Sequence, residues 1–129
     1  MNYYQNKNPL IALFMGAEQK GKPGDIWFAG LAGHGACDVN DLRYHKDWNW
    51  MMDALTRIKT LIVPEQETKE VQLQLEEAMI KWWEHLLHQL CILNLDQLWI
   101  SVVGFIEWWN QQPTLHVHPP HLINEYDNN

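Results

Sequence analysis

The stretch EVQLQLEEAMIKWWEHLLHQLCILNLDQLWISVVGFIEWWNQQ, residues 70–112, decides the fold that the sequence predicts. Its apolar residues recur at intervals of three and four, which is typical of amphipathic helices. The run divides at Leu93-Asn94-Leu95, where Asn94 followed three residues later by Gln97 has the pattern of a capping box. We therefore expect a helical hairpin over residues 67–112.

Each arm of this hairpin carries a tryptophan pair, Trp82-Trp83 in the first and Trp108-Trp109 in the second. Both pairs lie roughly 20 Å from the turn at the helical rise per residue, so antiparallel packing should bring the indoles to one level. The helical period places His85 and His88 on the solvent side of the first arm. The inner face expected for that arm comprises Val71, Leu75, Met79, Trp82, Trp83, Leu86, Leu87, Leu90 and Leu93.

The remainder of the chain predicts shorter elements. Asp47 is a suitable N-cap for a helix over residues 48–62, and Pro64 should end that helix and begin the next. Asn8-Pro9 should start a short N-terminal helix that ends near Gly16 or at residues 20–21, after a loose arm over residues 1–7. A strand is expected at residues 25–29, with a second at either 36–39 or 42–44.

Together these elements predict an α+β fold that is predominantly α. The hairpin packs with a third helix (48–62), a short N-terminal helix and a small strand region near residues 25–45. A length of 129 residues with 47% hydrophobic residues suits one compact domain, expected over residues 1–112. An extended or flexible tail rich in His, Pro and Asn should follow over residues 113–129.

The charge is distributed unevenly along the chain. The formal net charge is −7, and residues 61–129 hold ten acidic side chains against two basic ones. Because a nucleic-acid interface needs clustered Lys and Arg, this balance argues against direct binding of nucleic acid and favours a basic protein partner. Two cysteines, no segment resembling a signal peptide and no long apolar run predict a soluble protein of the cytoplasm, without a membrane span.

Histidine and cysteine provide the candidates for a metal site, for which zinc would be the expected ion. His34 and Cys37 are separated by two residues in a glycine-rich segment, and His45 follows. In the tail, His116 and His118 would share one face of an extended segment, close to His121. Ser101 is the only serine and lies in no nucleophile elbow, so the sequence argues more against an enzyme than for one.

Aromatic and aliphatic residues outside the inner stripes are candidates for partner binding, because aromatic rings are favoured contact anchors. We expect Trp50, Ile100 and Trp108 to point outward, and one of the three tryptophans Trp50, Trp83 and Trp108 to line an exposed groove. These four residues predict a protein–protein contact, with a second copy of the chain or a host-encoded protein as the partner.

Three blocks of the sequence resemble a known group of proteins. They are LIALFMG (residues 10–16), DLRYHKDWNWMM (residues 41–52) and VVGFIEWWN (residues 102–110). Their pattern is similar to Leu-x-Tyr-His-x-x-Trp-x-Trp-Leu-Met and Phe-Ile-x-Trp-Tyr-Asn in small uncharacterised phage and prophage proteins of the Bacteroidetes group. The resemblance implies a phage or prophage origin and a bacterial host cytoplasm, and the group carries no assigned activity.

The function expected from the sequence is therefore that of a non-enzymatic, phage-type protein that acts by protein–protein interaction and modulates a host protein. The alternative is a small metal-binding protein or metal-dependent enzyme that uses the histidine and cysteine ligands.

Overall fold

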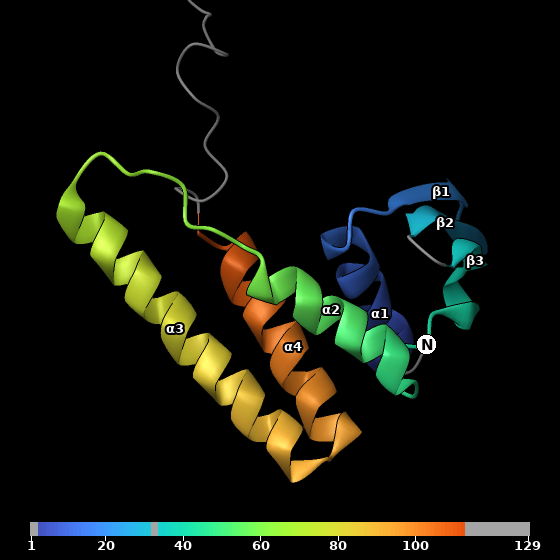
Figure 1. The fold of residues 1–129 in the computed structure, drawn as a ribbon. Helices are drawn as coiled ribbons and strands as arrows, with labels where there is room; N and C mark the ends of the chain where they lie inside the picture. The colour runs from blue at the N-terminus through green and yellow to red at the C-terminus, as the bar shows by residue number, and fades with distance from the viewer. Residues whose placement is uncertain (1–2, 32–33, 113–129) are drawn as a thin grey trace, which may run out of the picture.

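A computed structural model describes residues 3–31 and 34–112 of the chain and confirms the α+β, predominantly α fold (Figure 1). The expected tail over residues 113–129 lies outside the described residues. Three strands form one antiparallel sheet in the order β1-β2-β3. The elements are α1 (Tyr3–Phe14), β1 (Glu18–Lys22), β2 (Asp25–Leu31), β3 (Gly35–Asp38), a 3-10 turn (Val39–Asp41), α2 (Trp48–Lys59), α3 (Lys69–Ile92) and α4 (Leu95–Asn110).

The predicted helical hairpin is formed by α3 and α4 and is confirmed. Leu93 ends α3 in the left-handed conformation with a φ of 61°, and the side chain of Asn94 accepts a hydrogen bond from the Gln97 backbone N–H. The predicted level of the tryptophans is also confirmed for one member of each pair, because the Trp82 and Trp108 rings lie 6.4 Å apart. Local capping and helical period were therefore sufficient to define the hairpin.

Helix α4 is the centre of the molecule. It lies between α3 on one side and α1 and α2 on the other (Figure 1). Its core side chains are 0 to 1% exposed, since three helices cover it. They are Leu98, Trp99, Val102, Val103, Phe105 and Ile106.

A buried asparagine links α1 to α4 and to the segment before α2. The Asn8 amide oxygen accepts from Trp99 Nε1 at 2.9 Å, and its nitrogen donates to the Leu42 carbonyl at 3.2 Å. The same nitrogen lies 2.8 Å from His45 Nδ1. Indole N–H can only donate and a carbonyl can only accept, so these partners fix the amide orientation and make His45 Nδ1 an acceptor.

This role of Asn8 corrects the predicted start of the first helix. The helix begins at Tyr3 and Pro9 lies inside it, so Asn8 is no N-cap and residues 3–7 are helical. The side chain that could have capped a helix instead bonds to three residues distant in the sequence. Tertiary contacts thus overrode the local Asn-Pro signal.

The prediction that Pro64 begins the long helix is also wrong. Helix α2 ends at Lys59, and α3 begins only after Thr68, whose hydroxyl accepts from the Val71 backbone N–H. The connection is held by Gln72, which accepts from the Gln66 backbone N–H at 2.8 Å and donates to the Val63 carbonyl at 3.4 Å. A threonine N-cap with side-chain support was therefore stronger than the proline signal.

The sheet confirms the strand predicted at residues 25–29, which extends to Leu31, and the first of the two alternatives for its neighbour. Residues 42–44 form no strand. The sequence analysis missed β1, because all five of its residues are exposed and four are polar or charged. Backbone pairing with β2, such as Glu18 opposite Ala29, holds this strand without an apolar pattern.

Candidate functional site

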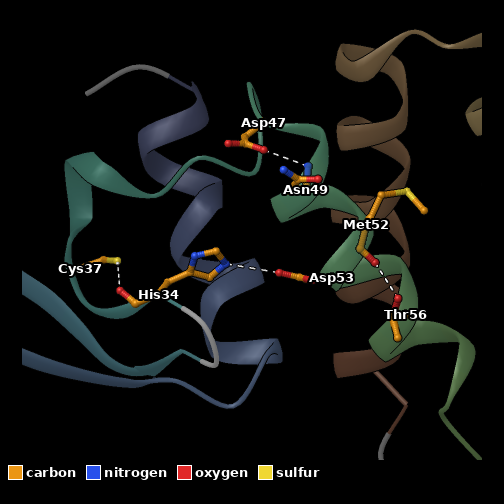
Figure 2. A network of polar contacts seen from close by, with 7 residues as sticks. All are labelled: His34, Cys37, Asp47, Asn49, Met52, Asp53 and Thr56. Atoms are coloured by element: carbon orange, nitrogen blue, oxygen red, sulfur yellow. Dashed lines mark hydrogen bonds and ion pairs between the residues drawn. The ribbon is translucent and has the colours of Figure 1, made fainter.

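The residues predicted to bind a metal do not converge. The His34 ring reaches Asp53 Oδ2 at 3.3 Å, whereas the Cys37 thiol donates to the backbone oxygen of His34 at 3.5 Å, on the other side of the residue (Figure 2). His45 pairs with Asn8 instead. The structure therefore places these three side chains in separate contacts.

Within residues 3–31 and 34–112, no three His, Cys, Asp or Glu side chains are grouped so that they could hold a metal ion. Burial, together with the charge of Asp41, raises the pKa of Cys37, which disfavours the thiolate that acts as a nucleophile. The tail candidates His116, His118 and His121 lie outside the described residues.

His34 instead borders a pocket of about 270 Å³ between α1, β2 and α2. Met15 and Leu31 provide its apolar wall. The polar lining comprises His34, Tyr44, Asp53, Thr56 and Arg57. Because these residues come from four separate parts of the chain, tertiary folding assembles the pocket.

Trp50 positions the polar wall of this pocket. Its ring stacks on His34 with centroids 3.8 Å apart and meets Tyr44 edge-on at 5.0 Å. Trp50 is 7% exposed, so the outward position predicted for it is wrong. His34 lies just before β3, and its imidazole stacks on the indole of Trp50 in the first turn of α2.

The other three residues predicted to bind a partner differ in exposure. Ile100 on α4 is exposed, as expected, and Trp83 is half-buried. Trp108 is also half-buried, because it contacts Trp82 and Phe105, whose centroid lies 5.9 Å away. The free outward position expected for Trp108 is therefore wrong, and the tryptophans of the hairpin act mainly in packing.

A more extensive apolar surface lies on the outside of α3. Leu73, Ile80 and Leu87 are 54%, 59% and 40% exposed, and they follow one another at intervals of seven residues. This interval returns to within about 20° of the same direction on a helix. We call these three residues the α3 outer stripe. The sequence predicts Leu87 on the inner face of this helix. That prediction is wrong, because the buried centre of α3 lies at Leu75 and Leu86.

The surroundings of the stripe are acidic. Glu76 flanks it on one side and Glu77 and Glu84 on the other, each within about 60° of Ile80 around the helix. All three glutamates are exposed. Helix α3 packs extensively only against α4 among the described elements, so no other described helix covers the outer stripe.

The two histidines of α3 are both exposed, as expected. His85 makes one contact in addition, because its Nε2 lies 3.0 Å from the Ser101 hydroxyl on α4 and thereby joins the two arms of the hairpin.

The sequence contained a signal for part of what was missed. The seven-residue interval of the α3 outer stripe and the Asp53–Arg57 spacing on one face of α2 are both visible in it. The proximity of Tyr44 and Leu31 to that face had no sequence signal.

Comparisons with known protein families, with curated proteins and with solved structures give no match to this chain. None of the described helices is long and apolar enough to cross a membrane.

Proposed function

We propose that this chain is a non-enzymatic protein that acts by protein–protein interaction, and that the exterior of α3 is its docking surface. The observation that carries the proposal is the α3 outer stripe, three large aliphatic side chains at heptad spacing on a helix that, among the described elements, packs extensively only against α4. Aliphatic side chains aligned along one face of a helix serve as anchors for a second helix in helix-in-groove and coiled-coil contacts.

The charge around the stripe defines the chemistry of the partner. Glu76, Glu77 and Glu84 flank the apolar seam, and residues 61–129 carry ten acidic side chains against two basic ones. An amphipathic helix with basic residues beside its apolar face would neutralise these flanks. We therefore assign the site to a basic amphipathic helix of another protein.

A second copy of this chain fits the charges less well. In an antiparallel pair centred on Ile80, the side of α3 that bears Glu77 and Glu84 would face the same side of the other copy. Like charges in register disfavour association. The homodimer is accordingly the competing outcome of the test, and the resemblance to phage proteins supports a host protein as the partner.

Two synthetic peptides can test this proposal. Each carries leucines at heptad spacing, one with lysine flanks and the other with glutamate flanks, and binding is followed by fluorescence anisotropy. The lysine peptide should bind, and its affinity should fall as salt is added, because salt screens exposed charge pairs. The glutamate peptide should not bind.

Ile80→Asp and Ile100→Asp form a matched pair of variants, since both replace an exposed isoleucine on the hairpin. Burial of an isoleucine is worth about 1.5–3 kcal/mol, so Ile80→Asp should weaken binding roughly ten- to a hundredfold. Ile100→Asp should have no effect. Equal losses in the two variants would contradict the proposal, and so would a dimer seen by light scattering that Ile80→Asp dissociates.

A further inference from the structure

The pocket between α1, β2 and α2 contains two opposite charges that do not neutralise each other. Asp53 and Arg57 are four residues apart on α2, so their side chains leave the same face on successive turns. No ion pair joins them in the described part of the chain. Asp53 instead pairs with His34 at 3.3 Å, and the Arg57 guanidinium lies over the Phe14 ring at 5.9 Å from its centroid. Separate contacts therefore position each charge.

The third polar group of the pocket is a buried hydroxyl. Tyr44 is 1% exposed, and its hydroxyl makes no hydrogen bond to residues 3–31 or 34–112. Burial and the charge of Asp53 raise its pKa strongly, so the group remains a hydrogen-bond donor. Buried tyrosine hydroxyls normally have a hydrogen-bond partner, and this one lines the pocket, where it can donate to a bound molecule.

The size and the remaining wall limit that molecule. Pockets for drug-sized ligands measure about 300–1,000 Å³. This pocket measures about 270 Å³, and Met15 and Leu31 are the apolar residues that line it. It suits a small molecule with one aliphatic group beside its charges.

We infer that this pocket binds a small zwitterion, an α-amino acid with an aliphatic side chain such as leucine. The Asp53 carboxylate accepts from the ammonium group, the Arg57 guanidinium and the Tyr44 hydroxyl donate to the carboxylate, and Met15 and Leu31 contact the aliphatic side chain. A purely anionic ligand would be repelled by Asp53, and a purely cationic one by Arg57. The pocket has no wall from α3, so this inference does not depend on the proposed docking surface.

The test is an NMR titration of the full chain with leucine and two analogues that each lack one charge. 4-Methylpentanoate has no ammonium group and isoamylamine has no carboxylate. Leucine should give saturable shifts at residues of the pocket with a Kd of about 1 mM or tighter, and each analogue should bind at least about tenfold more weakly.

Three conservative variants assign the contacts. Asp53→Asn should weaken the binding of leucine about tenfold without weakening the binding of 4-methylpentanoate. Arg57→Gln should weaken the binding of leucine without weakening the binding of isoamylamine. Tyr44→Phe should weaken the binding of leucine several-fold. The thermal stability of the protein should not change, because the variant removes a hydroxyl that has no hydrogen-bond partner among the described residues. Glu67→Gln, at an exposed residue before α3, is the control and should leave the binding of leucine unchanged.

The absence of saturable shifts with leucine at about 10 mM, tenfold above the expected Kd, would overturn the inference. It would also be overturned if either analogue bound as tightly as leucine, since one charged side chain would then be sufficient. Circular dichroism of each variant separates loss of binding from loss of the fold.

Discussion

Replacement of Asn8 by alanine should destabilise the protein by about 3 kcal/mol. The side chain makes three contacts of 2.8 to 3.2 Å, with Trp99, Leu42 and His45. Asn8 is 2% exposed, so water does not readily replace them. A hydrogen bond contributes about 1 kcal/mol net, and three of them sum to about 3 kcal/mol before any cavity is counted. Small domains have about 5–15 kcal/mol of total stability, so the loss is large.

Urea unfolding followed by tryptophan fluorescence measures this effect. Asn8→Ala should lower the midpoint without changing the slope, since the unfolded chain exposes the same surface. Asn110→Ala, at the exposed end of α4, is the matched control and should stay within about 0.5 kcal/mol of the parent. A loss below about 1 kcal/mol in Asn8→Ala would refute the reasoning, because it would mean that the three contacts contribute no net stability.

Three further changes test other parts of the structure. Burial, with a contribution from Lys46, lowers the pKa of His45 below its usual 6.5. The unfolding free energy should therefore be highest above pH 6.5 and should fall as the pH decreases through the lower folded-state pKa. His45→Gln should remove this decline, as measured by urea titrations at several pH values. Leu93→Gly should raise the unfolding free energy by about 0.5–1 kcal/mol, because Leu93 is 75% exposed and holds a φ of 61° that glycine adopts without strain; an unchanged or lower melting temperature would contradict this. Gly21→Ala should destabilise the β1–β2 hairpin by more than about 1 kcal/mol, since the added carbon would collide with the Asp25 carbonyl oxygen at a φ of +91°, and faster amide exchange in β1 would report it.

The hairpin could be predicted because its determinants are local. The cap at Asn94 and the helical period of α4 act within one or two turns, and they hold in the folded chain. The same kind of signal failed at Asn8, where partners far away in the sequence decided the outcome, and at Pro64, where the Thr68 cap overrode it. Local rules describe an isolated helix, whereas the hydrogen-bond partners of a buried side-chain amide are set by tertiary packing.

The candidate sites show the same division. Helical period separates faces correctly only when the buried centre of the helix is known, and Leu87 was assigned inward because α3 has apolar residues on more than one side. The pocket could not be predicted, because Tyr44 and Leu31 reach Asp53 only after the sheet folds against α2. Trp50 was misplaced for a related reason, since the ring that covers it belongs to His34.

The most direct test of the docking surface is an amide chemical-shift map of the full chain saturated with the lysine-flanked peptide. The largest shifts should follow one line along α3, through Leu73, Ile80, Glu84 and Leu87. Amides around the pocket at Asp53 should remain unchanged. Shifts spread over α2 and the sheet, or no shifts at all, would contradict the assignment of α3 as the binding surface.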